Sequence, residues 1–353
     1  MNARLNKPSV RLLSLAAAAS LLELGPIAAL LYQGQGILPV LAAGLAYQIG
    51  NAAPRPTMLS RRKIIGVAAV VGAILLLSFE ISTPLGLLGI ALLSWALQAV
   101  RRSVVFIKSE QPSTAQKRIA RVGGFIVATL VPITVWLTLV LLMIAMALPT
   151  KSLISYKGSR HKVVLAHPLE WTMLVHQIHY FAYAYAVPVL VAQPILGGVP
   201  LTGFWFACGW ISYLSAETLW RRFPPKPTFI VGHLCLTIIL LMLTVMNYSP
   251  WATAVLWILS GFGGGTVYCL TLLHERNNLS HANLERAEDV GHLLGVSLAL
   301  ACVYFLNWNA GQLPALGSIW AFVAALAMIA MSYFHFKSGY LNPKPQGGED
   351  AGQ

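Results

Sequence analysis

The chain has 353 residues, of which 57% are hydrophobic and 10% are charged. A soluble globular domain carries about 25% charged residues, so this composition excludes an ordinary water-soluble fold and predicts a membrane protein. The net charge of +13 is spread over short gaps between apolar stretches, which argues against a nucleic-acid partner and makes the lipid bilayer the expected one.

The first apolar stretch, 11–32, follows Arg4 and Lys7. Basic residues before an apolar run also occur in signal peptides, but this run is long enough to span a bilayer, so we interpret it as a transmembrane helix. Glu23 lies near its middle. An unpaired charge at that depth costs about 2.5–3.5 kcal/mol, so Glu23 is expected to face a cavity, to pair or to be protonated. We consider two roles: a proton carrier for coupled transport, and a hydrogen bond between helices.

Ten further apolar stretches follow the first. They predict an all-α polytopic membrane protein with about 11 (11–12) transmembrane helices, and they leave no room for a soluble domain. The tail over 337–353 is expected to be disordered and cytoplasmic. The four cysteines lie within apolar stretches without metal-ligand spacing, so no metal or other cofactor is expected. The ten stretches are 36–52, 64–80, 83–107, 121–149, 168–192, 199–217, 228–247, 251–273, 289–307 and 314–336.

Alternate gaps between these stretches carry nearly all the Lys and Arg. Basic loops stay in the cytoplasm, so both termini are predicted to be cytoplasmic. One segment conflicts with this pattern: if 121–149 crossed once, the basic connector 150–167 would lie outside. A helix of that length exceeds one crossing and falls short of two. Three accounts are open: a bent or hairpin element that returns to the cytoplasm, a basic external segment, and the loss of one helix from an ancestral twelve.

The chain is predicted to consist of two similar halves, 1–149 and 168–336, joined by the connector 150–167. The gap after the second stretch contains a Pro-basic-Pro-Thr sequence in both halves, and the long gap ends at a glycine in both halves. Parallel repeats of about six helices are typical of secondary transporters, which bind substrate at the midplane between the halves. The matching segments are Pro54-Arg55-Pro56-Thr57 with Pro225-Lys226-Pro227-Thr228, and Arg121-Val122-Gly123-Gly124 with Asp289-Val290-Gly291-His292.

This arrangement resembles the major facilitator superfamily. The superfamily signature between the second and third helices is a Gly, an Asp, and a basic run with a second Gly. The first half has Gly50, Arg55 and Arg61-Arg62-Lys63 but lacks the acid, whereas the second half has Glu217 and Arg221-Arg222 but lacks the glycines. The resemblance implies two helical bundles around a central cavity that the first helix of each half would line.

Polar and aromatic residues gather in the stretch 168–192. At helical spacing His176, His179, Tyr180 and Tyr183 share one face. We interpret this face first as lining of a substrate cavity, second as a source of interhelical hydrogen bonds, and last as a metal site, because no third ligand lies nearby in sequence. Trp205 is a further candidate for stacking on a substrate or for facing lipid. Trp210 is expected to face lipid, and His233 and His292 are expected to be structural.

Two other groups have predicted roles. Four glycines suit close helix packing, and they are Gly263, Gly264, Gly291 and Gly295. The basic pair Arg221 and Arg222 would pair with Glu285 and Asp289 and close the cytoplasmic side as a latch; the alternative is that these acids belong to a solvated loop.

We therefore expect a monomeric secondary transporter of the cytoplasmic (inner) membrane, without enzymatic activity, that moves a small organic solute by alternating access. Protons are the candidate coupling ion, and a drug or natural-product exporter or a siderophore or metabolite permease is the expected type. Two alternatives are open. One is a polytopic transferase with His and Glu at the membrane interface, and the other is a non-transporting assembly or sensory protein derived from a transporter.

Overall fold

The computed structural model describes residues 7–53, 62–103, 114–130, 133–147, 165 and 167–341, and within them the chain is all-α without strands. The predictions for Pro54–Thr57, for Arg61, for nearly all of the connector 150–167 and for most of the tail fall outside these ranges. The predicted all-α, multi-pass fold class is confirmed.

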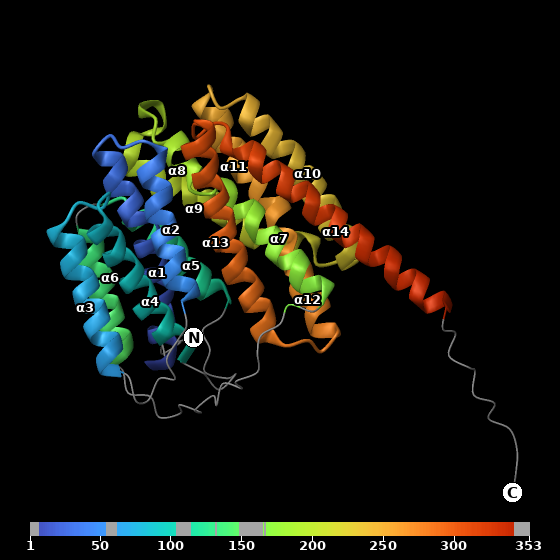
Figure 1. Ribbon diagram of the computed structural model, residues 1–353, viewed down its shortest axis with the longest axis horizontal. Coiled ribbons are helices and arrows are strands. Elements are labelled where there is room, and N and C mark those ends of the chain that lie inside the picture. Colours follow the sequence, from blue (N-terminus) through green and yellow to red (C-terminus); the bar gives the residue numbers. More distant parts are fainter. Residues whose placement is uncertain are drawn as a thin grey trace, which may run out of the picture.

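The first half contributes six helices, which Figure 1 shows from blue to green on one side of the molecule. They are α1 (Lys7–Tyr32), α2 (Ile37–Ala52), α3 (Arg62–Ser78), α4 (Pro84–Ser103), α5 (Thr114–Ala128) and α6 (Ile133–Ala147). The second half lies beside it, and its longer spans are interrupted by breaks and 3-10 turns. Its elements are α7 (Pro168–Tyr183), α8 (Ala186–Val191), η3 (Pro194–Leu196), α9 (Gly198–Trp220), α10 (Pro225–Val245), α11 (Pro250–Gly264), η4 (Gly265–Val267), α12 (Tyr268–Arg276), α13 (His281–Leu306) and α14 (Leu313–Leu341).

Seven helical segments among the described residues are long and apolar enough to cross a membrane, and three shorter apolar helices accompany them. Their starts follow local sequence signals. Proline occupies the first helical position of α4, α7, α10 and α11, where its missing N–H costs no hydrogen bond. At the start of α7, the His167 side chain accepts from the Leu169 N–H while the Glu170 carboxylate accepts from the His167 N–H, which satisfies donors that the helix leaves free.

The helices run alternately between two ends of the bundle, which we call basal and distal. The basal end holds the start of α1 and the end of α2, and the distal end holds Tyr32 at the end of α1 (Figure 1). At the basal end, Arg286 of α13 donates to the Ala52 carbonyl of α2 at 3.3 Å. Arg118 of α5 pairs there with Glu217 of α9 at 3.2 Å. Both contacts join one half of the chain to the other.

The stretch 121–149 does not form one helix. It contributes to α5 and α6, and the Thr134 hydroxyl donates back to the Ala128 carbonyl at 3.2 Å, a contact that a continuous helix would not allow across six residues. The end of α5 lies at the distal end, where Thr129 donates to the Pro200 carbonyl. From there α6 packs back along α1, so both flanks of the connector lie at the basal end. Of the three accounts, the hairpin is the one that this structure contains.

Four helices lie at the outer edges of the bundle, α3 and α6 in the first half and α10 and α14 in the second (Figure 1). Each presents a row of exposed large apolar side chains, which suit contact with lipid tails. Examples are Ile74 on α3, Trp136 on α6, Ile238 on α10 and Phe322 on α14. If α7 with α8 and α11 with α12 are each counted as one interrupted span, α10 and α14 are the third and sixth spans of the second half. They correspond to α3 and α6, the third and sixth helices of the first half.

The glycine segments of both halves pack on the first helix of their half, although the packed glycine, Gly124 in one half and Gly291 in the other, is shifted by one position between the matched segments. Gly124 of α5 packs on α1, where an added Cβ would lie 2.6 Å from the Ala17 carbonyl oxygen. Gly291 of α13 packs on α7 in the same way, 2.6 Å from the Leu174 carbonyl oxygen. Gly295 and Gly263 also meet backbone oxygens, at 2.7 Å, whereas a Cβ on Gly264 would make only ordinary contact with Tyr213 at 3.6 Å. Small residues thus let helix backbones approach at these contacts.

Adjacent glycines in α5 provide a matched test of this packing. Gly124→Ala should lower the free energy of unfolding by about 1–3 kcal/mol, because backbone must shift to admit the methyl group. Gly123→Ala should be neutral or raise it by up to about 1 kcal/mol, since no described residue lies within 4 Å of the place that its methyl group would take. Thermal unfolding of the two variants in detergent measures the difference. Equal melting temperatures would show that α1 and α5 do not approach as closely as described.

Candidate functional site

A polar cavity of about 320 Å³ lies between the two halves. Helices of both halves line it, and its walls combine charged groups, amides and aromatic rings. Its charged members are two acids, Glu23 and Glu288, and two arginines, Arg101 and Arg121. Its other members are Tyr47, Gln48, Asn51, Gln98, Gln177, Tyr180, Phe181, Trp210, Tyr213 and His292. A cavity with converging polar groups in an otherwise apolar protein is the expected form of a binding site for a small molecule.

The deepest charged group of this cavity is Glu23, which is 6% exposed. Its carboxylate accepts from the Arg121 guanidinium at 3.5 Å, so α1 and α5 share an ion pair in which the acid is buried and the Arg121 side chain is 27% exposed. The guanidinium also lies over the Trp210 ring of α9, 4.1 Å from the ring centroid, in the arrangement of a cation–π contact. Arg121 therefore joins an acid of the first half to an aromatic residue of the second.

A chain of hydrogen bonds runs along α2 on the same side of the cavity. The Tyr185 hydroxyl, at the break between α7 and α8, accepts from Gln48 Nε2 at 2.8 Å. Gln48 Oε1 in turn accepts from Asn51 Nδ2 at 3.0 Å, and Asn51 Oδ1 accepts from the Ser94 hydroxyl of α4 at 3.2 Å. Because buried amides are costly unless paired, this network fixes the side chains on the first-half wall.

The second-half wall is built from α7, α9 and α13. Gln177 Oε1 and His292 Nε2 form a hydrogen bond of 3.1 Å between α7 and α13. The His292 ring also packs on Phe181, with ring centroids 4.3 Å apart, and Tyr180 lies 6.3 Å from Tyr213 of α9. This wall offers phenols, an imidazole and an amide to the same cavity that Glu23 lines.

Exposure of the lining side chains increases toward the basal end. Gln98 is 5% exposed, whereas Arg101, one helical turn nearer the end of α4, is exposed to solvent. Glu288 and His292 are half-buried. The cavity therefore reaches solvent at the basal end, near Arg101.

The predicted cavity residues divide into two groups. Glu23 and Tyr180 line the cavity, whereas His176 and His179 point into the second half, where they meet His233 of α10. The other two, Tyr183 and Trp205, also lie away from the cavity. The Tyr183 hydroxyl donates to the Ser260 hydroxyl at 3.4 Å, and Trp205 Nε1 donates to the Leu196 carbonyl at 3.0 Å, near the distal end.

The structure does not bring the four predicted latch residues together. Arg221 and Arg222 follow the end of α9 and have exposed side chains, and Glu285 and Asp289 lie on α13. Among the described residues, no ion pair joins either arginine to these acids. At the basal end the halves are instead connected by the Arg118–Glu217 pair and by the bond from Arg286 to Ala52.

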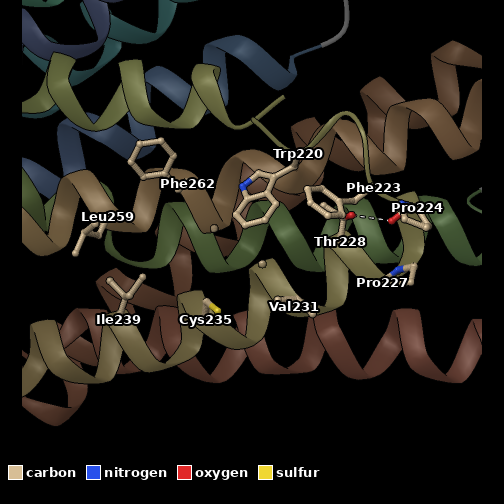
Figure 2. Close-up of a pocket in the computed structure, with 12 residues that line it drawn as sticks. Trp220, Phe223, Pro224, Pro227, Thr228, Val231, Cys235, Ile239, Leu259 and Phe262 are labelled. Atoms are coloured by element: carbon tan, nitrogen blue, oxygen red, sulfur yellow. Dashed lines mark hydrogen bonds between the residues drawn. The ribbon is translucent and has the colours of Figure 1, made fainter. Parts of the chain in front are cut away.

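A second pocket lies on the second half, between α9, α10 and α11 (Figure 2). It is lined by apolar and small residues, among them Trp220, Phe223, Val231 and Phe262, and none of its lining residues is charged. Cys235, an exposed free cysteine, opens onto it. Such a surface suits acyl chains and offers nothing to hold a polar solute in place.

The fold agrees with known structures, although sequence comparison finds nothing. No family sequence model and no curated protein sequence matches the chain. A solved structure of the nucleoside transporter NupG aligns with a TM-score of 0.62 and 16% identity, over 94% of this chain and 99% of that one.

Two further matches cover nearly as much. A bacterial homologue of the iron transporter ferroportin in an inward-facing state has a TM-score of 0.59 and 16% identity over 92% of this chain and 97% of that one. A D-xylose–proton symporter has a TM-score of 0.59 and 13% identity over 91% and 95%. The chain is a multi-pass membrane protein with the fold of the major facilitator superfamily, as its sequence pattern predicted.

Proposed function

We propose that this protein is a secondary transporter that moves a small, polar organic solute through the central cavity by alternating access. The observation that carries the proposal is the buried Glu23 carboxylate, paired with Arg121 deep in a polar cavity between two similar halves. Burying a carboxylate in a membrane protein is costly, and a site that must bind and release a polar solute gives it a reason to be there. The solved structures that share the fold are those of transporters, which supports the same proposal.

The cavity favours a particular class of solute. At about 320 Å³ it is near the lower end of the range of about 300–1,000 Å³ for ligand pockets, and its amides and charges are suited to a molecule with several hydrogen-bonding groups. Trp210, Tyr180 and Tyr213 offer aromatic faces for a ring. Because the histidines of α7 face elsewhere, the drug, natural product or siderophore expected from the sequence has less support than a compact sugar-like or nucleoside-like molecule.

We propose that the basal end faces the cytoplasm and that Glu23 carries the coupling proton. Alternate basic gaps place the basal end inside by the positive-inside rule. Protonation of Glu23 would end its ion pair with Arg121 and free the guanidinium for the solute, which would couple solute binding to proton movement. The proposal also takes the chain to work as a monomer in the inner membrane.

Flux into liposomes tests this function. Purified protein is reconstituted with its basal end in a defined orientation and offered labelled uridine, D-xylose and succinate, with and without a proton gradient. We expect protein-dependent flux of at least one of these classes, driven by the gradient. Solute turnover into a chemically altered product without flux would instead support the membrane transferase.

Trp205 and Trp210, two of the three tryptophans of α9, test whether the solute binds in the central cavity. Trp210→Leu should weaken binding of the transported solute about tenfold, because the loss of the ring removes an aromatic face and the cation–π contact to Arg121, together worth about 1–2 kcal/mol. Trp205→Leu is the matched control, since its ring lies outside the cavity lining, and its affinity should equal that of the wild type. The solute concentration that gives half-maximal flux measures the affinity of each variant. A weaker affinity in Trp205→Leu than in Trp210→Leu would place the solute near Trp205.

A further inference from the structure

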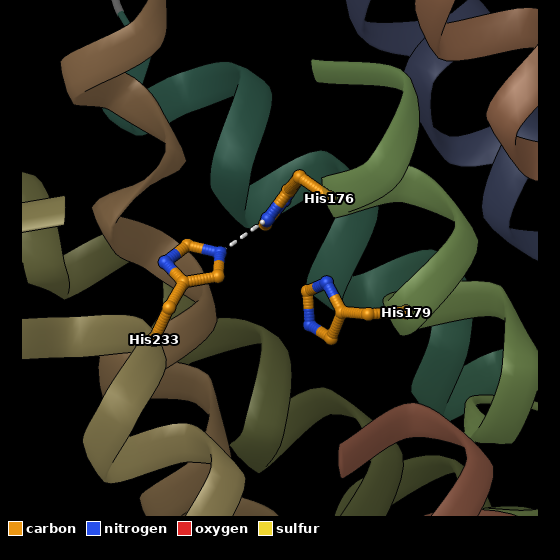
Figure 3. Close-up of side chains that lie close together, drawn as sticks. All are labelled: His176, His179 and His233. Atoms are coloured by element: carbon orange, nitrogen blue, oxygen red, sulfur yellow. Dashed lines mark hydrogen bonds between the residues drawn. The ribbon is translucent and has the colours of Figure 1, made fainter. Parts of the chain in front are cut away.

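Three histidines form a buried cluster within the second half, away from the central cavity. His176 and His179 come from α7 and His233 comes from α10, and Figure 3 shows the three rings turned toward one another. Each side chain is at most 1% exposed. Their candidate ligand nitrogens all lie within 4.8 Å of one another, so one ion of ordinary size lies within reach of all three.

Hydrogen bonds account for only part of this arrangement. His233 Nδ1 lies 3.0 Å from the Phe229 carbonyl oxygen and donates to it, which leaves the Nε2 lone pair directed at the cluster. His176 Nδ1 lies 2.9 Å from that Nε2. Among the residues that the structure describes, neither nitrogen of His179 has a hydrogen-bond partner, although both nitrogens are buried. A buried polar group without a partner is costly, so a purely structural role leaves His179 unexplained.

We infer that His176, His179 and His233 bind a late first-row divalent metal ion, Zn²⁺ foremost. Neutral imidazole is a common ligand of these ions, and three histidines with a fourth position for water form a familiar zinc set. The set contains no carboxylate, which disfavours Mg²⁺ and Ca²⁺. Ionisation of a zinc-bound water would lower the buried charge by one unit.

This ion would be a resident component that joins α7 to α10, not the transported solute. None of the three histidines belongs to the lining of the central cavity. The inference goes beyond the proposed transport function, and either can fail without the other. The sequence spacing of His176 and His179 on one helical face supplies two ligands, and the third lies 57 residues further along the chain from His176.

Metal content tests the site directly. Protein without a polyhistidine tag is equilibrated with Zn²⁺, desalted and analysed by elemental mass spectrometry, and Co²⁺ is bound in parallel to give visible absorption bands of a low-symmetry site. We expect one zinc ion per chain in the wild type and a loss of most of that zinc in His179→Phe and His233→Gln. His179→Phe removes no hydrogen bond, so it is expected to keep the fold.

His274→Phe is the matched control, because His274 is also buried, at 1% exposure, but lies on α12 outside the cluster. It should retain zinc like the wild type, and zinc should raise the melting temperature of both but not that of His179→Phe. Equal zinc in the wild type and His179→Phe, or a wild type that retains no zinc and gives no Co²⁺ bands, would overturn the inference.

Discussion

Replacing Arg121 with methionine is expected to abolish solute flux and to lower the free energy of unfolding by about 1–3 kcal/mol. The substitution leaves the Glu23 carboxylate buried without its cation, and it removes the group that connects α1, α5 and the Trp210 ring. Flux in liposomes and thermal unfolding in detergent measure the two effects. Much of the loss of stability should be recovered in Glu23→Gln/Arg121→Met, because removing both partners leaves no buried charge.

Arg118→Met is the matched control for Arg121→Met. Arg118 lies one turn earlier on α5 and is 27% exposed, like Arg121, but its partner Glu217 is 46% exposed whereas Glu23 is 6% exposed. Exposed pairs contribute about 0–1 kcal/mol, so this variant should stay close to the wild type in stability and retain flux. If Arg118→Met and Arg121→Met lowered flux equally, the Glu23–Arg121 pair would have no special role in transport.

Glu23→Gln is expected to abolish proton-driven uptake of the solute while leaving exchange of the solute across the membrane. Glutamine keeps the shape of the side chain and its hydrogen bonding but cannot release a proton, so uptake driven by a proton gradient should be lost. Exchange of labelled for unlabelled solute across the membrane needs no net proton movement and should remain measurable.

Glu217→Gln provides the control, because it removes an acid outside the cavity, and it should leave gradient-driven uptake unchanged. Gradient-driven uptake by Glu23→Gln at the wild-type rate would show that another group carries the proton, whatever the fate of the transport proposal.

Composition and the alternation of basic gaps were enough to predict an all-α, multi-pass chain, and the repeated halves with their partial signature segments predicted the major-facilitator-like fold by resemblance. They failed at 121–149, where apolar length alone could not distinguish one long crossing from two short ones. The helix α5 begins at Thr114 and carries Lys117, Arg118 and Arg121, so its basic first half looked like part of a loop. Residues 129 and 130 lie between the two helices, and Pro132, whose position falls in the undescribed pair 131–132, was the available sign of a break.

The site was predicted only in part, because helical spacing defines a face but not the neighbour that this face meets. His176 and His179 share a face as expected, yet that face meets α10. The residues that were missed follow a pattern visible in the sequence: polar side chains recur three or four positions apart in otherwise apolar helices, which marks a cavity wall. Ser94, Gln98 and Arg101 on α4 form such a row, as do Gln48 and Asn51 on α2.

Access to the central cavity from both sides of the membrane is the most direct test of alternating access. A single cysteine is placed at Gln98 after the native cysteines are replaced, and a membrane-impermeant thiol reagent is applied to sealed vesicles of each orientation. A chain that retains only Cys269, which is fully buried, serves as the unreactive control. Alternating access predicts labelling of this cysteine from the basal side and also from the distal side. The transported solute should slow labelling from either side. Labelling from the basal side alone would contradict it.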